Sequence, residues 1–281
     1  MTGNKRIFIG SMILVLLLFV AGSHSAEARP ERIVSLGPSL TEELYMLGAQ
    51  DSLVGCTTYC RVPSDKKNIE KVGTVVEVNL EKIVSLKPDL VLATSLTDLR
   101  AIEKMKLLGI NVIVFPTAKD FTELCGQVLQ LGRLVGREKD AQELVSETKE
   151  KVAAIISKKG DRPPRTVFVQ IGTKPLFAAS KDSFINSVVE FAGGTNIVSG
   201  SRSGIYSREK VIKEDPDVII IATMGLVGRS EKRAWEEYKT LKAVKESSIY
   251  IVDPYKFCGP TPGNFVSALE ETVRMLRIKD E

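Results

Sequence analysis

Short apolar runs alternate with amphipathic stretches along most of this chain. Such alternation is typical of buried parallel strands whose sheet is covered by helices on both faces. The strands expected from the pattern are residues 32–36, 53–57, 89–93, 111–115, 166–171, 218–221 and 249–252. The stretches between them have helical spacing, and so does a closing segment at residues 263–276. The pattern therefore predicts an α/β protein.

One part of this pattern occurs twice. Asn79 to Thr94 reads NLEKIVSLKPDLVLAT, and Ser207 to Ala222 reads SREKVIKEDPDVIIIA, without a gap between the two copies. Each copy predicts a helix, a Pro-Asp turn and a buried strand. Because internal repeats of this size reflect repeated structural units, we expect two similar Rossmann-like lobes with parallel sheets, and a ligand site in the cleft between them.

A long amphipathic segment, residues 138–158, lies between the two copies. At 1.5 Å per residue such a helix is about 30 Å long, which is enough to join two lobes. A surface helix of one lobe is the alternative. We expect an N-terminal lobe at residues 29–118, linking helices at 119–160 that include this single long α-helix, and a C-terminal lobe at 161–281.

Residues 1–28 have the pattern of a cleaved secretory signal peptide. Lys5 and Arg6 precede an apolar stretch at residues 7–20, and Ala26-Glu27-Ala28 provides a small-residue cleavage site. A membrane anchor is the alternative, but the apolar stretch is shorter than the roughly 20 residues of a spanning helix. No cysteine lies near the cleavage site, so we expect a periplasmic protein that is not lipid-anchored.

The charged and histidine residues exclude several classes of function. The formal net charge is only +4, without a basic stripe, so nucleic acid is not an expected partner. The only histidine, His24, lies in the expected signal peptide. The mature chain therefore has no Ser-His-Asp or Cys-His catalytic system and no histidine-based zinc site. We expect no enzyme activity, no cofactor and no bound metal of its own.

The four cysteines are Cys56, Cys60, Cys125 and Cys258. Cys56 and Cys125 occupy apolar positions of an expected strand and helix, which favours buried thiols. Cys60 and Cys258 lie in expected loops, and a disulfide between them would join the lobes. Four cysteines allow three pairings, and the sequence does not choose among them.

Several motifs taken together resemble one family. They are RIVSLGPSLTEELYMLGA, TTYCRVP, FAGGTNI, the two repeated segments and the closing PTP helix. They resemble the helical-backbone (class III) periplasmic substrate-binding proteins, which deliver vitamin B12, haem and ferric siderophores to ABC importers. The resemblance implies a monomeric receptor whose partners are a permease and its ATPase subunits. It is strongest to the vitamin B12-binding receptors, so a cobalamin or other corrinoid is the expected ligand.

Two alternatives remain open. The first is a ferric-siderophore or haem receptor of the same type, which keeps the fold and changes the ligand. The second is a tetrapyrrole-handling enzyme, because chelatase-type enzymes have similar paired lobes. A receptor would return its ligand unchanged, whereas an enzyme would convert it.

The resemblance also implies ligand-binding positions, beyond the carboxyl ends of the strands where open α/β sheets bind ligands. Tyr59 and Phe177 match aromatic residues that clasp the corrin ring in the vitamin B12 receptors. Val75, Thr94 and Ser203 stand where those receptors have tryptophan. Nearby aromatic residues could compensate or could simply be packing residues, and two arginines could bind an anionic ligand or remain solvated. The complete candidate set is Tyr59, Arg61, Thr94, Phe177, Arg202, Tyr206, Tyr255 and Phe257.

Glu81 and Glu209 occupy the same place in the two repeats. In receptors of this family each lobe presents a glutamate to basic residues of the permease, which would make these two residues the docking contacts. The alternative is structural, because an acid in the first turn of a helix stabilises it by about 0.3 to 1 kcal/mol. Asn79 and Ser207 are the expected N-caps of these helices.

Overall fold

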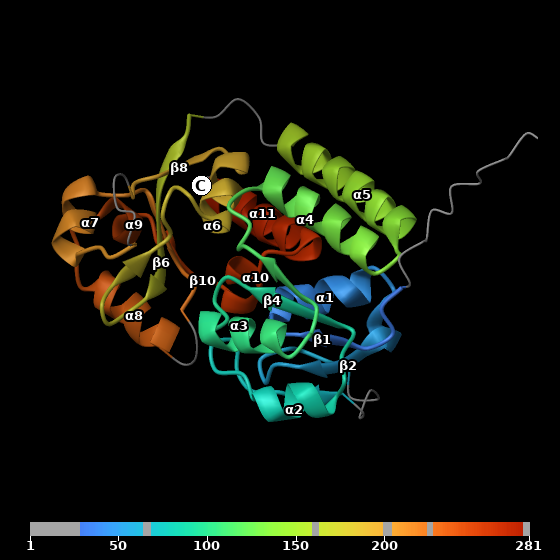
Figure 1. The fold of residues 1–281 in the computed structure, drawn as a ribbon. Coiled ribbons are helices and arrows are strands. Elements are labelled where there is room, and N and C mark those ends of the chain that lie inside the picture. Colours follow the sequence, from blue (N-terminus) through green and yellow to red (C-terminus); the bar gives the residue numbers. More distant parts are fainter. Residues whose placement is uncertain (1–28, 64–68, 159–162, 199–203, 224–226, 278–281) are drawn as a thin grey trace, which may run out of the picture.

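The computed structural model describes residues 29–63, 69–158, 163–198, 204–223 and 227–277. It contains two α/β lobes, with the C-terminal sheet on the left of Figure 1 and the N-terminal sheet at the lower right. The predicted fold class is confirmed. The expected signal peptide and Arg202 lie outside the described residues.

The N-terminal lobe is built on a five-stranded sheet in which every pair of neighbouring strands is parallel. The strand order is β3-β2-β1-β4-β5. The strands are β1 (Ile33–Ser35), β2 (Leu53–Cys56), β3 (Glu70–Lys71), β4 (Leu90–Thr94) and β5 (Val112–Phe115). The helices are α1 (Pro38–Met46), the 3-10 turn η1 (Gln50–Ser52), α2 (Leu80–Ser85) and α3 (Leu99–Leu107).

The C-terminal lobe has a second five-stranded sheet, in which only β7 is antiparallel to its neighbour. The order is β10-β9-β6-β7, and β8 also pairs with β6. The strands are β6 (Arg165–Gly172), β7 (Phe177–Ala178), β8 (Gly194–Asn196), β9 (Val218–Ile221) and β10 (Ile249–Ile251). The helices are α6 (Phe184–Phe191), α7 (Arg208–Glu214), α8 (Val227–Glu236), α9 (Lys242–Lys245), α10 (Pro254–Cys258) and α11 (Pro262–Leu276).

Two helices carry the chain from one sheet to the other. They are α4 (Phe121–Leu134) and α5 (Glu138–Ser157), and α5 is the long helix expected from the sequence. The buried face of α5 includes Ala141, Val145 and Val152. It packs against α4 and against α11 of the C-terminal lobe, and Figure 1 shows these three helices side by side. Side-chain packing therefore joins the lobes in addition to the covalent crossing.

Four phenylalanines form what we call the apolar junction between the lobes. They are Phe121 of α4, Phe184 and Phe191 of α6, and Phe265 of α11. The Phe265 ring centroid lies 4.5 Å from Phe121, 5.6 Å from Phe184 and 5.4 Å from Phe191. One hydrophobic core runs through this junction from the N-terminal to the C-terminal sheet. Burial of these rings therefore favours a fixed arrangement of the two lobes.

The two repeated segments have the same local structure. The residues before the prolines, Lys87 and Asp215, both adopt left-handed backbone angles, with φ of 45° and 44°. The following Asp89 carboxylate accepts a hydrogen bond from the Arg32 backbone N–H at 2.8 Å, and Asp217 accepts one from the Thr166 N–H, also at 2.8 Å. Each Pro-Asp turn is thus tied to the start of the first strand of its own lobe, at the residue before β1 in one lobe and within β6 in the other.

Glu43 of α1 is a buried acid in the N-terminal lobe, with 2% of its surface exposed. Burial raises the pKa of its carboxyl to about 8, and the neighbouring Glu42 contributes in the same direction. The folded state therefore favours the protonated form, because a buried carboxylate loses the hydration that it has in the unfolded chain.

Removing the central ring of the apolar junction should destabilise the whole protein. Phe265 is fully buried, and truncation of such a side chain typically costs about 3 to 5 kcal/mol. We expect Phe265→Ala to lower the free energy of unfolding by this amount in urea denaturation. Leu107→Ala is the control, because Leu107 is 87% exposed and should change stability by less than about 0.5 kcal/mol. A loss as small as that of the control would contradict the role of the junction.

The buried Glu43 should make stability fall as pH rises. The pKa of Glu43 in the folded state exceeds the ordinary 4.5. The protonated carboxyl therefore contributes its full share of the free energy of unfolding below pH 4.5, and this contribution is lost as pH rises to about 8. At about 1.4 kcal/mol per pH unit, the loss should be roughly 3 to 5 kcal/mol. Urea denaturation at pH 5 and pH 8 should show this dependence for the wild type and not for Glu43→Gln. The exposed Glu143→Gln is the control, and equal slopes for all three proteins would refute the assignment.

Candidate ligand-binding site

The segments that follow the carboxyl ends of the strands in the two lobes contact each other. Arg61 comes after β2 and lies against Tyr255, which follows β10. Glu42, in the helix after β1, accepts a hydrogen bond from the Thr261 hydroxyl at 3.2 Å. The edges of the two sheets at which their parallel strands end therefore face one another at this point. In open α/β sheets this edge is the usual place for a ligand.

Two of the predicted ligand-binding residues meet across the lobes. The guanidinium carbon of Arg61 lies 3.7 Å from the centroid of the Tyr255 ring, a distance typical of cation–π contacts. Burial raises the pKa of Tyr255 to about 12, and the nearby Glu42 carboxylate adds to this effect. The Tyr255 hydroxyl therefore stays protonated at neutral pH and can donate a hydrogen bond.

Glu42 completes a polar contact between the lobes that the sequence did not reveal. Burial raises the pKa of its carboxyl, while hydrogen bonds with Thr261 and Tyr255 and the positive charge of Arg61 act in the opposite direction. The same carboxyl thus interacts with Arg61 of its own lobe and with Thr261, Tyr255 and Asn264 of the other lobe. From the sequence, an acid near the start of a helix is indistinguishable from one that only offsets the helix dipole.

Tyr59 is the most accessible of the predicted aromatic residues, with 59% of its surface exposed. It lies in the turn between Thr57 and Cys60, two residues before Arg61. An aromatic ring left in water at a strand end has a large apolar surface available for a ligand.

Thr94 and Phe177 are both partly buried. Thr94 ends β4, and its methyl group lies close to Gly37, where an added Cβ would come within 2.5 Å of it. Phe177 belongs to β7 and packs beside Gly172 and Gly204. Each keeps some accessible surface, but both side chains also have local packing partners.

Tyr206 and Phe257 lie in the protein interior, which agrees with the alternative that they are packing residues. Tyr206 is 7% exposed and its ring centroid lies 5.8 Å from that of Phe168 in the C-terminal core. Phe257 is 1% exposed and belongs to the core that includes the apolar junction. Their surfaces are occupied by protein atoms, so the structure gives them packing roles and leaves Tyr59, Phe177 and Tyr255 as the accessible aromatic candidates.

Several exposed aliphatic residues lie at the same strand ends and were not singled out from the sequence. Leu96 follows β4 and is 63% exposed, Ile251 ends β10 and is 45% exposed, and Ile205 is 52% exposed and forms a bridge with Phe177. In a sequence, such residues look like ordinary core positions. In the structure they add apolar surface to this edge of both lobes.

Glu81 and Glu209 are exposed residues in the first turns of α2 and α7. The predicted N-caps are confirmed, since the side chains of Asn79 and Ser207 accept hydrogen bonds from the N–H groups of Lys82 and Lys210. Hydrogen bonds from its own N–H and from the Ser207 hydroxyl lower the pKa of Glu209. Both acids therefore face solvent, on short helices at the outer ends of the two lobes (Figure 1).

The cysteines only partly follow expectation. Cys56 and Cys125 are buried thiols, as predicted. Cys60 is also buried, and both it and Cys258 are free in the structure, so the proposed interlobe disulfide is absent there. Cys60 instead contacts Cys56.

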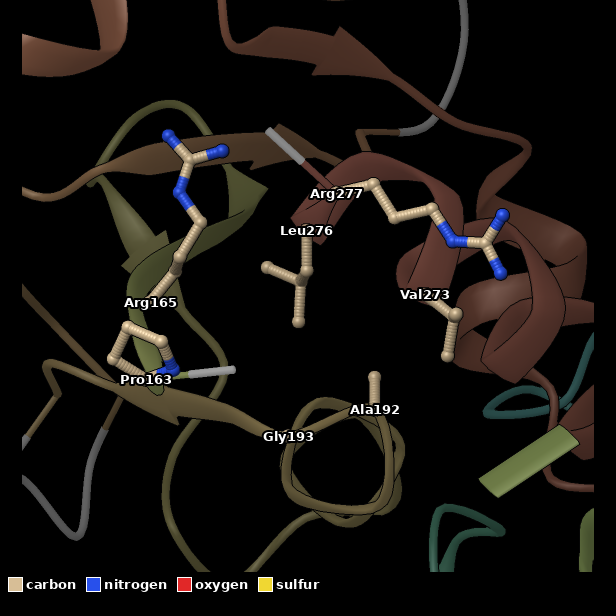
Figure 2. A pocket seen from close by; sticks show the side chains of 7 residues that line it. All are labelled: Pro163, Arg165, Ala192, Gly193, Val273, Leu276 and Arg277. Carbon is tan, nitrogen blue, oxygen red and sulfur yellow. The ribbon is translucent and has the colours of Figure 1, made fainter. Parts of the chain in front are cut away.

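Two hollows lie away from the candidate residues. The first, of about 30 Å³, lies where β6 begins, and Figure 2 shows Leu276 pointing into the space between Pro163 and Ala192. It has room for water and not for a metal chelate. The second, of about 270 Å³, is an open hollow beside α4. It is lined by Pro116, Thr117, Lys119, Glu123, Gly126, Gln127 and Gln130.

Within the described ranges, no group of three or more metal-binding side chains converges on one point. No helix in those ranges is long and apolar enough to span a lipid bilayer.

Comparison with known proteins identifies the family. The family model described as periplasmic binding protein matches residues 33–255. The ABC transporter substrate-binding lipoprotein YvrC of Bacillus subtilis is 35% identical over 80% of this chain and 73% of its own length. The vitamin B12-binding protein of Photorhabdus laumondii is 33% identical over 76% of this chain and 78% of its own.

A solved structure gives the same result for the fold. A possible iron-binding, periplasmic solute-binding protein from Staphylococcus epidermidis superposes with a TM-score of 0.78 at 29% identity. The match covers 88% of this chain and 99% of that one. With the family model matching most of the chain and both lobes present, the protein belongs to the periplasmic binding protein family.

Proposed function

We propose that this protein is the substrate-binding receptor of an ABC importer and that it captures a metal chelate, with cobalamin or another corrinoid as the best candidate. The observation that carries the proposal is the contact between the carboxyl edges of the two sheets, where Arg61 meets Tyr255. The similarity to a vitamin B12-binding protein supports the choice of ligand. The exposed Tyr59 and Leu96 offer apolar surface to a flat ligand at this edge.

An iron chelate is the second candidate. Arg61 is exposed and carries a guanidinium that can bind the anionic oxygens of a ferric siderophore or the propionates of haem. Tyr59 also provides a phenol oxygen for an iron centre. The iron-binding description of the staphylococcal structure supports this candidate.

The proposed receptor acts by capture and docking, without chemistry of its own. Its ligand would leave unchanged, which separates this proposal from a chelatase-like enzyme. We further propose that it works as a monomer, and that the permease and its ATPase subunits supply the energy of transport.

We place the protein in the periplasm after removal of residues 1–28. The Bacillus relative is named a lipoprotein, whereas the first cysteine of this chain is Cys56, a buried residue of β2. We therefore propose release without a lipid anchor. Mass spectrometry of the exported protein should find an unmodified N-terminus near residue 29, and an added diacylglycerol would refute this part.

Calorimetric titration of the purified mature protein with cyanocobalamin, haemin and ferric siderophores tests the ligand. We expect saturable binding of cyanocobalamin, weakened about tenfold by Tyr59→Ala, which corresponds to about 1.4 kcal/mol of lost ring contact. Leu107→Ala, an exposed change on α3, is the control and should bind like the wild type. Binding of only an iron chelate would support the second candidate, and binding of none would overturn the receptor proposal.

The double variant Glu81→Lys/Glu209→Lys tests docking. We expect it to abolish ligand-dependent stimulation of the importer ATPase, because reversed charges would repel the basic residues of the permease. Calorimetric ligand affinity should stay unchanged. Glu143→Lys/Glu150→Lys alters two exposed acids of α5 by the same charge and should leave stimulation intact. Normal ATPase stimulation by the Glu81→Lys/Glu209→Lys variant would show that neither glutamate is needed for docking.

A further inference from the structure

Cys56 and Cys60 form a buried cluster that the proposed function does not use. Their thiols are hydrogen-bonded to each other. The hydroxyl of Thr41 lies 3.1 Å from the Cys60 sulfur, and so does that of Thr57. The Lys71 ammonium donates to the Cys56 sulfur at 3.2 Å and to the Cys60 carbonyl at 3.0 Å. Two sulfur atoms thus share one cluster of polar side chains next to the turn that carries Tyr59.

The surroundings favour a thiolate at Cys60. Hydrogen bonds from the Cys56 thiol and from the Thr41 and Thr57 hydroxyls lower the pKa of Cys60, although burial opposes this. The same interaction raises the pKa of Cys56, because the two sulfur atoms cannot both carry a negative charge at low cost. One cysteine is therefore prepared as a nucleophile and the other remains a thiol.

The same cluster is unsuited to a metal ion. The Lys71 ammonium already contacts the Cys56 sulfur, and its positive charge would repel a cation there. Throughout the described segments, no third cysteine, aspartate, glutamate or histidine joins the pair. A positive charge beside one sulfur of the pair instead promotes thiol–disulfide exchange, because it stabilises that sulfur as the reactive thiolate.

We propose that Cys56 and Cys60 are a redox-active dithiol that closes reversibly to a disulfide when it meets a molecular disulfide, such as oxidised glutathione, in the oxidising compartment. The Cys60 thiolate attacks one sulfur of that disulfide, forming a mixed disulfide and releasing one thiolate. The Cys56 thiol then loses its proton to solvent, and its sulfur attacks the Cys60 sulfur and displaces the second thiolate. Two protein thiols are oxidised, and one disulfide is reduced to two thiols.

Access to the pair depends on the turn at residues 57–60. Cys56 is fully buried and Cys60 is 5% exposed, whereas the flanking Tyr59 and Arg61 are exposed. A small disulfide can reach Cys60 when this turn opens, and Cys56 can react only afterwards, from within. The order of attack follows from this burial as well as from the charge distribution.

Peptide mapping of the mature protein tests the proposal without any ligand, so its result is independent of the proposed function. Trypsin should release Ile33 to Arg61 as one peptide that contains only Cys56 and Cys60, while Cys125 and Cys258 fall in separate peptides. Reduced protein is equilibrated with oxidised glutathione, quenched with acid and labelled with N-ethylmaleimide under denaturing conditions. We expect this peptide to carry no label and to be lighter than the reduced, unlabelled peptide by two hydrogens. After reduction and a second labelling step it should carry two labels.

Cys258 is exposed and serves as an internal control, because its mixed disulfide shows that the oxidant is active. Two labels on the 33–61 peptide while Cys258 has reacted would overturn the proposal. A crosslink between Cys60 and Cys258 would overturn it as well.

Single variants test the order of attack. In Cys56→Ser the nucleophile lacks its partner, so we expect Cys60 to accumulate as the mixed disulfide with glutathione. In Cys60→Ser the buried Cys56 should remain unreacted. Circular dichroism establishes whether each variant is folded. If one variant is unfolded, the peptide mapping of the wild-type protein still tests the formation of the disulfide. Trapping at Cys56 instead of Cys60 would refute the assigned roles.

Lys71 is a positioning residue in this scheme. We expect Lys71→Met to slow closure of the mixed disulfide at pH 7 about tenfold and to shift the pH dependence of this step upward, because the Cys56 sulfur loses the neighbouring charge that lowers its pKa. Lys71→Arg should retain most of the rate. A pH profile that is identical in Lys71→Met and the wild type would show that the lysine is only structural.

Discussion

The relation between the two lobes depends on the burial of aromatic rings in the apolar junction. The Phe265 ring of α11 contacts rings from α4 and α6, and one continuous core extends from the first sheet to the second. A protein with this core cannot open widely without exposing those rings to water, at about 25 cal/mol for each Å² of apolar surface. Motions between the lobes are therefore restricted to small rotations that keep the junction packed.

The proposed ligand edge is held from both lobes by polar contacts of a different kind. Arg61 stacks on Tyr255, and Glu42 binds Thr261. These contacts are directional and partly exposed, so a ligand can replace them with contacts of its own more readily than it could disrupt an apolar core. The two kinds of contact therefore have different roles. The buried rings fix the arrangement of the two lobes, while the polar residues at the ligand edge can exchange their contacts with each other for contacts with a ligand.

Much of the fold could be predicted from the sequence, because the apolar runs and the repeated Pro-Asp turn are local signals. Asn79 and Ser207 were identified as caps for the same reason. The strand β8 was missed, since its residues Gly194, Thr195 and Asn196 include two with low strand propensity. Helix α10 was missed because it is only five residues long.

The candidate site was harder to predict because it depends on burial and on contacts between distant segments. Tyr206 and Phe257 are aromatic residues near strand ends, and nothing local in the sequence distinguishes them from Tyr59. The contact between Arg61 and Tyr255 joins residues that are 194 positions apart in the sequence. Such a contact becomes visible only when both sheets are placed. The repeat indicated that two edges exist, but it did not indicate which side chains would meet between them.

The Pro-Asp turns have a consequence for how the molecule could report its state. Helices α2 and α7 have only six and seven residues, so neither would be stable alone. Each is followed directly by a turn whose aspartate is bonded to the first strand of its lobe. Helices α2 and α7 therefore move together with the sheets of their own lobes. Any rotation of one lobe against the other therefore changes the spacing between Glu81 and Glu209, the two residues of the proposed docking contact.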